Sequence, residues 1–160
     1  MSGMISSSKK ARQAGAPGHS VERFVMTTRQ GEPTGNGCIF CAFDPARLIG
    51  HNDLAFAIFD RFPVTDLHVL IIPRRHEPDY LGLSPEEVQA SHMLLREVSV
   101  ALHDRDLSIA GFNIGINIGE AAGQTISHAH LHLIPRRRGD VPEPRGGVRN
   151  VIPGKGLYTP

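Results

Sequence analysis

Three alternating histidines constrain the fold of this chain more than any other feature. His128, His130 and His132 are separated by single apolar residues. A β-strand sends alternate side chains to opposite faces, so this spacing puts the three imidazoles on one face and the apolar residues on the other. In a helix, residues two apart lie about 200° apart, which would scatter the rings. The segment is therefore predicted to be a strand that carries a row of imidazoles about 7 Å apart.

The alternative is that these histidines only decorate a solvent-facing strand, since a single exposed histidine is an ordinary surface residue. Here, however, three histidines alternate strictly, and they follow a predicted turn that contains Gly119 and Gly123. Turn residues directly before a strand with one uniform face favour a specific site over surface decoration. We therefore expect this stretch to bind a ligand or carry out chemistry.

The composition suits one globular domain. The chain has 160 residues, 40% of them hydrophobic, and a net charge of +1. This length and content allow a single core, and the charge argues against a dedicated nucleic-acid-binding surface. No run approaches the roughly 20 apolar residues of a membrane span, and the first residues lack the apolar core of a secretory signal. With two cysteines and no export signal, no disulfide framework is expected and the cytoplasm is the default location.

Positive charge is concentrated after two predicted strands. Arg74-Arg75 and Arg136-Arg137-Arg138 each follow an Ile-Pro pair. Such clusters raise the local concentration of an anionic substrate by electrostatic steering. Solubilising the ends of strands is an equally good explanation, and the sequence leaves both open.

The chain divides into three parts. Residues 1–20 are rich in Ser, Gly and Lys, carry no acidic residue, and are predicted to be a disordered tail; a targeting peptide is a weaker alternative, because Arg12 is their only arginine. Residues 21–140 form the predicted domain, beginning with a short strand or helical turn at 21–27. Residues 141–160 carry frequent Gly and Pro and are predicted to be irregular.

The secondary-structure pattern predicts an α+β domain. Apolar runs predict strands within 52–59, 67–72 and 112–118, beside the histidine strand. Ser84, Pro85 and Glu87 form a helix start with an N-cap, a proline in the first turn and a capping box. An apolar stripe continues this helix to about residue 104. His92 and His103 lie in the helix and are predicted to be surface residues. Strands around one capped helix indicate a mainly antiparallel sheet.

Both cysteines lie in one short motif, Cys38-Ile39-Phe40-Cys41. Thiolates at this spacing can both reach one tetrahedral metal ion, which would need two further ligands from elsewhere in the chain. Two buried, inert thiols are the alternative. Thioredoxin-like redox chemistry is not favoured, because no βαβ pattern surrounds the pair.

The motif from His128 to Ile134, together with Phe59-Asp60, the segment from His68 to Pro73, and Asn117, resembles the histidine triad (HIT) superfamily of nucleotide hydrolases and transferases. The resemblance covers about residues 38 to 138, so that 21–140 would be a HIT domain. It implies a mainly antiparallel five-stranded sheet with two helices, and two-fold homodimers. One position departs from the family: members usually have Gly where this chain has Leu67, so the local turn is expected to differ.

The resemblance implies covalent catalysis by histidine. With an ordinary pKa of about 6.5, a neutral imidazole is well populated near pH 7 and can attack phosphorus. His130 would attack the α-phosphate of a nucleotide through Nε2, while its Nδ1–H is held by a main-chain carbonyl, and water would then release the monophosphate. His132 would donate to phosphate oxygens or protonate the leaving group. His128 would do the same if it is not a metal ligand, and His68 would orient an active-site imidazole.

Other residues would bind the nucleotide. The two carboxylate oxygens of Asp60 suit the paired hydroxyls of a ribose. Asn117, Gln124 and Thr125 would lie beside the phosphates, where a glycine-rich loop leaves N–H groups free. The resemblance alone implies an adenine-binding wall, whose members could equally be ordinary core: Ile39, Phe40, Phe43 and Ile58.

The resemblance also implies a structural zinc ion. In some members, and in the related galactose-1-phosphate uridylyltransferases, zinc is held by such a cysteine pair, a histidine after the second strand and the first triad histidine. The matching residues here are Cys38, Cys41, His76 and His128. Mg²⁺ would enter only with a polyphosphate substrate.

The expected activity is hydrolysis of dinucleoside polyphosphates or nucleoside phosphoramidates with release of a nucleoside monophosphate. Two alternatives stay open at this stage. One is a nucleotidyltransferase or phosphorylase that passes the nucleotidyl group to phosphate, and the other is a nonenzymatic nucleotide-binding protein that would not need His130.

Overall fold

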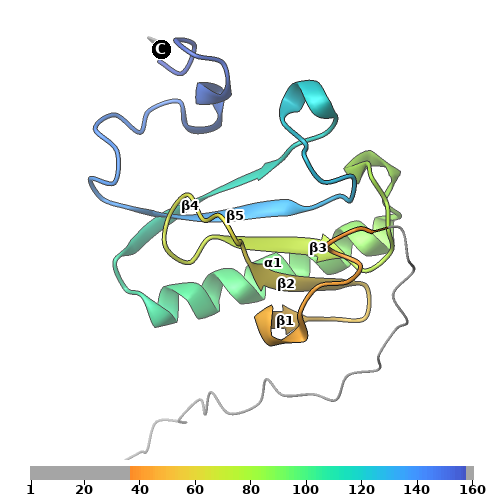
Figure 1. Cartoon of the computed structure of the whole chain (residues 1–160). Coiled ribbons are helices and arrows are strands. Elements are labelled where there is room, and N and C mark those ends of the chain that lie inside the picture. The colour runs from red at the N-terminus through yellow and green to blue at the C-terminus, as the bar shows by residue number, and fades with distance from the viewer. Residues whose placement is uncertain (1–36, 158–160) are drawn as a thin grey trace, which may run out of the picture. The chain divides into compact units, whose positions relative to one another are not determined.

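The computed structural model describes residues 37–157, so the predicted tail 1–20 and the predicted element at 21–27 lie outside the described residues. A five-stranded antiparallel sheet forms the centre of this part of the chain (Figure 1). Its spatial order is β1-β2-β3-β5-β4. The strands are β1 (Leu48–His51), β2 (Ala55–Phe59), β3 (Val69–Pro73), β4 (Ile109–Ile116) and β5 (Leu131–Arg137).

One α-helix, α1 (Pro85–Arg105), occurs within residues 37–157. The antiparallel five-stranded sheet is therefore confirmed, whereas the second predicted helix is not. The remaining helical segments described are short 3-10 turns: η1 (Pro45–Arg47), η2 (Tyr80–Gly82), η3 (Glu120–Ala122) and η4 (Gly147–Val151). Because η4 lies in the C-terminal segment, that segment is not wholly irregular.

Helix α1 begins where the sequence predicted. The Ser84 side chain accepts the Glu87 N–H, and the Glu87 carboxylate accepts the Ser84 N–H, which completes the capping box. The helix continues to Arg105, where Asp106 caps it through its main chain. Its charged and polar residues give it no apolar stretch long enough to cross a membrane, and no other helix in residues 37–157 has one.

The sheet buries a hydrophobic core on each face. One core lies between the sheet and α1, which runs across that face (Figure 1). A smaller cluster lies away from the helix and contains Phe40, Phe56, Ile58, Leu70 and Ile72. The helix-side core contains Ala55, Ala57, Val69, Ile71, Leu94, Leu95, Val98, Leu102, Ile109, Leu131 and Leu133.

The register of β5 separates the two kinds of residue in the histidine motif. His132 pairs with Leu70 of β3, and directly opposed residues share a face, so the His132 ring lies on the side away from α1. Leu131 and Leu133 enter the helix-side core. The predicted division into a histidine face and an apolar face is therefore confirmed within β5.

The strand itself is shorter than predicted, because His128 and His130 precede β5. Pairing between β3 and β5 ends at Ile71 and Leu131. Beyond this point the Ala129 N–H donates to the main-chain oxygen of Glu77, 2.6 Å away in the loop after β3. This loop replaces the strand ladder as the partner of the motif's first half.

Other boundaries shift by two or three residues. β3 begins at Val69 instead of 67 because Leu67 adopts a left-handed conformation with φ 64°, which a strand cannot contain. β2 begins at Ala55, since the Asn52 side chain binds the N–H groups of the preceding turn. β4 covers Ile109–Ile116 instead of 112–118, so Asn117 lies directly after it. β1 was not predicted.

Candidate active site and metal centre

One ring nitrogen of His130 is hydrogen-bonded to the main chain. Its Nδ1 lies 2.8 Å from the main-chain oxygen of His128, and the ring is 7% exposed. Because a carbonyl can only accept, Nδ1 carries the proton and a neutral ring keeps its lone pair on Nε2. The edge of Phe40 packs against the ring with centroids 5.1 Å apart. This is the orientation predicted for a nucleophile that attacks through Nε2.

His132 lies beside His130, with ring centroids 5.0 Å apart, which is closer than the spacing predicted along the strand. Its Nδ1 is 3.0 Å from Nε2 of His68, while its own Nε2 is buried without a hydrogen-bond partner among the described residues. Burial, reinforced by the neighbouring His130 and His68, lowers the pKa of His132 to about 4. The ring is therefore neutral near pH 7, and Nε2 is available to a ligand.

His68 connects His132 to a carboxylate. Oδ2 of Asp60 lies 3.3 Å from Nδ1 of His68, and the Val64 N–H lies 3.4 Å from the same nitrogen. Burial lowers the pKa of His68, and the charge of Asp60 opposes part of that effect. A neutral His68 that accepts from Val64 carries its proton on Nε2 and donates it to His132, so that Nε2 of His132 bears the free N–H. The predicted contact between His68 and an active-site imidazole is present.

Asp60 has protein neighbours at both oxygens. Besides the contact with His68, its Oδ1 accepts the Phe62 N–H at 2.9 Å. Its side chain is 16% exposed, so it can still meet a ligand. The prediction assigned Asp60 to a ribose and did not foresee its contact with His68.

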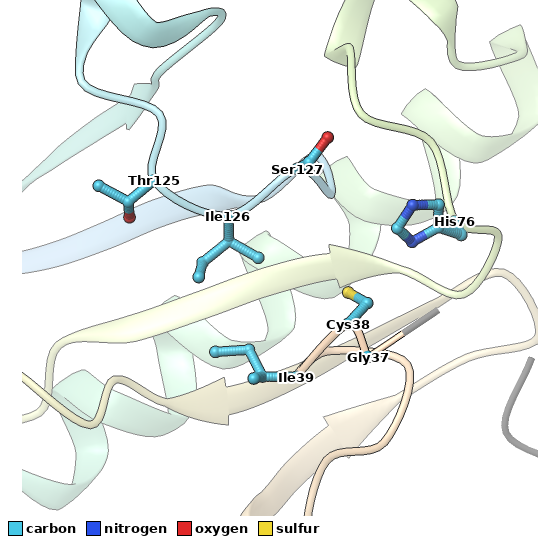
Figure 2. Close-up of a pocket in the computed structure, with 7 residues that line it drawn as sticks. All are labelled: Gly37, Cys38, Ile39, His76, Thr125, Ile126 and Ser127. Carbon is cyan, nitrogen blue, oxygen red and sulfur yellow. The ribbon is translucent and has the colours of Figure 1, made fainter. Parts of the chain in front are cut away.

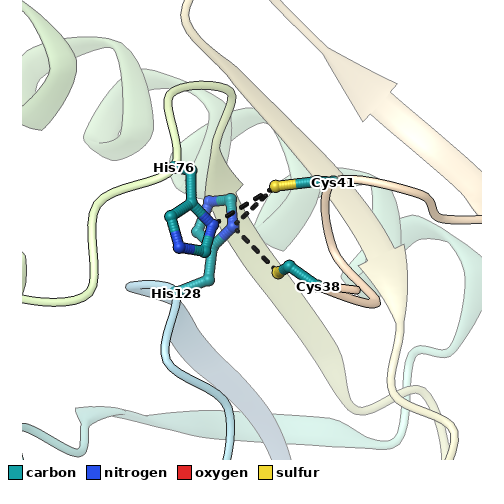
Figure 3. Close-up of side chains that lie close together, drawn as sticks. All are labelled: Cys38, Cys41, His76 and His128. Atoms are coloured by element: carbon teal, nitrogen blue, oxygen red, sulfur yellow. Dashed lines mark hydrogen bonds between the residues drawn. The ribbon is translucent and has the colours of Figure 1, made fainter. Parts of the chain in front are cut away.

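A second group of side chains surrounds His128 (Figure 3). Nδ1 of His128 lies 3.5 Å from Sγ of Cys38 and 3.6 Å from Sγ of Cys41, and Cys41 Sγ lies 3.3 Å from Nδ1 of His76. The donor atoms of all four residues lie within 4.8 Å of one another. With bond lengths of about 2.0 to 2.3 Å, donors around a tetrahedral zinc ion stand about 3.3 to 3.8 Å apart. Both the donor types and their spacing fit zinc.

The other nitrogen of His128 is also engaged. Nε2 lies 2.9 Å from the main-chain oxygen of Pro73, and the residue is completely buried. Donation from Nε2 leaves the lone pair on Nδ1, the form in which a metal-binding histidine is commonly held by a carbonyl. Both ring nitrogens of His128 already have protein partners, so the metal-ligand role fits this geometry better than the predicted alternative role as a phosphate donor.

A pocket of about 260 Å³ opens beside the four-residue cluster (Figure 2). The predicted residues Ile39 and Thr125 line it, and Ile39 is 57% exposed. Ser127 and Ile126 also line it and were not predicted, because a lone serine or isoleucine in a loop carries no sequence pattern. The full lining is Gly37, Cys38, Ile39, His76, Thr125, Ile126 and Ser127.

The other members of the predicted adenine wall are less accessible. Phe40 is 5% exposed and packs on the rings of His128 and His130. Phe43 is half-buried and stacks on Phe56, with centroids 4.3 Å apart. Ile58 is completely buried in the cluster away from the helix, so it belongs to the core and cannot touch a ligand as placed.

Gln124 shapes its loop instead of facing a phosphate. Its Oε1 accepts the Gly119 N–H at 2.8 Å, and its Nε2 donates to the main-chain oxygens of Pro78 and Ile126. These bonds engage both the oxygen and the nitrogen of the side-chain amide, which departs from its predicted role beside the phosphates. Thr125 is exposed in the pocket, and Asn117 is half-buried at the end of β4.

Three of the five clustered arginines form ion pairs. Arg75 pairs with Glu87 and Glu77, Arg136 with Asp140, and Arg137 with Asp106. Because their charges are balanced locally, these three arginines contribute little to long-range steering. They also do more than solubilise the ends of strands, since each pair joins two segments or closes a turn.

The sequence model of the HIT domain family matches residues 43–139 of this chain. A HIT-like protein from Mycoplasma pneumoniae is 38% identical over 105 residues, which are 63% of this chain and 72% of that protein. An adenylylsulfatase from Arabidopsis thaliana is 35% identical over 109 residues, which are 66% of this chain and 55% of that protein. An asymmetrical bis(5'-nucleosyl)-tetraphosphatase from Schizosaccharomyces pombe is 37% identical over 90 residues, which are 56% of this chain and 49% of that protein.

Among solved structures, a zinc-bound histidine triad family protein from Mycobacterium smegmatis superposes with a TM-score of 0.60. The two sequences are 38% identical, and the match covers 65% of this chain and 78% of that one. That neighbour shares the fold described above and contains the metal that the cluster around His128 would fit.

Proposed function

Because this chain belongs to the HIT domain family, we propose that it is a nucleotide hydrolase that cleaves at an α-phosphate through a nucleotidyl-histidine intermediate. Named members of the family act on nucleotides, which supports the substrate class. The proposed substrates are dinucleoside polyphosphates or nucleoside phosphoramidates. The proposed product is a nucleoside monophosphate.

One observation carries this proposal: the Nδ1 of His130 is tied to the His128 carbonyl, so a neutral ring presents a lone pair on Nε2. Attack by Nε2 on phosphorus forms an N–P bond and breaks the bond to the leaving group. Attack by water then breaks the N–P bond and restores the imidazole. A fixed tautomer removes one source of disorder before the attack.

His132 would supply an N–H to the reacting phosphate from the position next to His130. Its Nε2 is buried close to His130 and has no hydrogen-bond partner within the described part of the chain, which suits a donor to an anionic oxygen. We propose that His132 donates to a phosphate oxygen or to the leaving group, and that His68 holds its ring in position through Nδ1. Asp60 would bind the ribose with the part of its carboxylate that remains exposed.

We also propose that Cys38, Cys41, His76 and His128 hold a structural zinc ion. Four sulfur and nitrogen donors at tetrahedral spacing, with no fifth donor among residues 37–157, suit a closed structural site. When bound, the ion would join the cysteine loop to the segment in front of β5 and so keep His130 in place. Mg²⁺ would accompany only a polyphosphate substrate.

The decisive experiment identifies products. The protein is incubated with diadenosine tetraphosphate or adenosine 5'-phosphoramidate, with and without inorganic phosphate, beside His130→Ala and the exposed-helix control His103→Ala. We expect AMP from the wild type and from His103→Ala, and none from His130→Ala. ADP that appears only with phosphate would instead establish the phosphorylase alternative, and binding without turnover would establish the nonenzymatic one.

A homodimer remains a proposal. Met93 and Val100 are exposed on the outer face of α1, where an apolar contact with a second copy would bury them. Analytical ultracentrifugation of the wild type and of Val100→Glu measures this directly. A wild-type protein that sediments as a monomer at all concentrations would rule the dimer out.

A further inference from the structure

The loop between β3 and η2 provides His76, the only member of the four-residue cluster that lies neither in the cysteine loop nor in the histidine motif. A ligand on a loop must be held by neighbouring contacts if it is to wait in position for a metal. The sequence neighbours of His76 are Arg75 and Glu77. Both make such contacts, and their side chains are hydrogen-bonded to each other.

Arg75 joins this loop to the start of α1. Its Nε donates to Oε1 of Glu87 at 2.8 Å, and its Nη2 donates to Oε2 of Glu87 at 2.9 Å. Nη2 also donates to the main-chain oxygen of Gly82 at 2.9 Å. Glu87 is 6% exposed and is fixed in turn by the capping box with Ser84. The guanidinium is thus bound in a bidentate pair to a carboxylate that the helix already holds rigidly.

Glu77 continues the same network on the other side of His76. Its Oε2 accepts from Nη1 of Arg75 at 2.8 Å. Its main-chain oxygen accepts the Ala129 N–H at 2.6 Å, between His128 and His130. A continuous set of hydrogen bonds therefore runs from the N-terminus of α1, through Arg75 and Glu77, to the segment that carries the nucleophile.

We propose that Arg75 is a positioning residue that fixes His76 against Cys38, Cys41 and His128 and thereby sets the affinity of the cluster for zinc. This inference rests on the zinc proposal above. A ligand that is already ordered loses less conformational freedom when the metal binds, so the affinity is higher. Lysine would keep the charge but could not form the bidentate pair together with the bonds to Glu77 and Gly82.

The test measures zinc affinity in the full reduced chain by competition with a chromogenic chelator. Arg75→Ala is expected to bind zinc at least about tenfold more weakly than the wild type, and Arg75→Lys to lie between the two. Arg74→Ala is the matched control, because Arg74 has the same charge and its Nε donates to the main-chain oxygen of Asn52, outside this network. It is expected to stay within about twofold of the wild type.

A double-mutant cycle with His76→Ala separates positioning from a general loss of structure. If Arg75 acts through His76, Arg75→Ala weakens zinc binding in the wild-type background but not in the His76→Ala background. The Co²⁺ ligand-field spectrum adds a second readout, because a displaced His76 changes the coordination sphere. Thermal unfolding of the metal-free variants measures any purely structural loss.

Should Arg75→Ala fail to fold, Glu87→Gln decides the question, because it keeps a capping side chain and removes the charged partner. It is expected to weaken zinc binding several-fold. Unchanged affinity in whichever variant folds, or an equal loss with and without His76, would overturn the role of Arg75 while leaving the zinc site intact. A wild type that binds no zinc would overturn the zinc proposal itself, and this inference with it.

Discussion

The two ends of the histidine motif make different contacts although their residues are the same. At one end, His128 faces two thiols and a second imidazole, and its other nitrogen binds a main-chain oxygen. At the other end, His132 faces His68, which in turn faces the carboxylate of Asp60. The first environment suits a soft metal ion, and the second suits proton donation. The loop that meets each ring, and not the spacing of the histidines, determines what the ring can do.

His130 lies between these two ends and belongs to neither. Its Nδ1 is hydrogen-bonded to the main chain, and its flanking ring contacts are with Phe40 and His132. The proposed division of labour is therefore a fixed metal end, a free nucleophile and a proton-donating end. The following predictions test whether these parts are separable.

The largest expected effect is on catalysis. His130→Ala should lower kcat by about 10⁴-fold or more, because the step that forms the N–P bond is lost. The same variant should keep its zinc and melt close to the wild-type temperature, whereas His128→Ala should lose the zinc. Rates and metal content are measured on the same preparations. Loss of zinc from His130→Ala would show that the two parts cannot be separated.

Removal of the metal should have the next largest effect, a loss of thermal stability. At zinc concentrations about 1,000-fold above Kd, binding stabilises the folded state by about 4 kcal/mol. Chelation should therefore lower the melting temperature by on the order of 10 °C. Differential scanning calorimetry with and without a chelator measures this. The matched control is Cys41→Ser, whose melting temperature should not respond to the chelator.

Acid should destabilise the folded protein through His132, at the other end of the motif. The pKa of His132 is about 4 in the folded protein and ordinarily about 6.5, so between these values the unfolded chain binds a proton that the folded chain does not. Stability should consequently fall as the pH drops through this window. Between pH 7 and pH 4 the wild type should lose on the order of 2 kcal/mol more than His132→Gln, which has no such proton to bind. Urea unfolding at each pH measures the difference, and parallel curves for the two proteins would contradict it.

A smaller effect is expected from the residue that holds His132. His68→Gln removes the imidazole behind the proposed donor and should lower kcat about tenfold for a leaving group that needs a proton. A substrate with an activated phenolate leaving group should be affected much less, since it departs without protonation. Zinc affinity should not change. Equal losses for both substrates would mean that His68 has only a structural role.

The smallest effect concerns the turn before His68. Leu67 has φ 64°, and glycine adopts this conformation without the steric cost that a side chain incurs. Leu67→Ala and Leu67→Gly both lose the packing of Leu67 on the helix-side core. The glycine variant should nevertheless be more stable than the alanine variant by about 1 kcal/mol, because it alone removes the strain. Denaturant unfolding compares the two, and a more stable alanine variant would refute the argument.

The sequence predicted those features that depend on local patterns. The capping box at Ser84 and Glu87 follows from residue types at fixed spacing, and the faces of β5 follow from strict alternation. The grouping of Cys38, Cys41, His76 and His128 was suggested by resemblance, because no local rule relates segments so far apart in the chain.

Where the structure departs from these predictions, contacts between distant segments are the reason. Ile58 and Gln124 were assigned to nucleotide binding by their sequence positions, but contacts from other segments place the first in the core and engage the second within its loop. The hydrogen bonds from Arg75 to Glu77, Gly82 and Glu87 were not predicted for the same reason. A charge after a strand does not reveal which carboxylate will meet it.

The order of the strands also determines when the site can form. Among the five described strands, β5 is the last to be synthesised, yet it lies between β3 and β4. Until it arrives, β3 has one unpaired edge and β4 has no strand partner among the described residues, and such edges readily pair with other chains. Roughly 60 residues separate β3 from β5, which at about 5 to 20 residues per second is several seconds of synthesis. The insertion that brings His132 into the sheet is the same event that joins β4 to it, so a chain stopped before β5 lacks this histidine and exposes strand edges that favour aggregation.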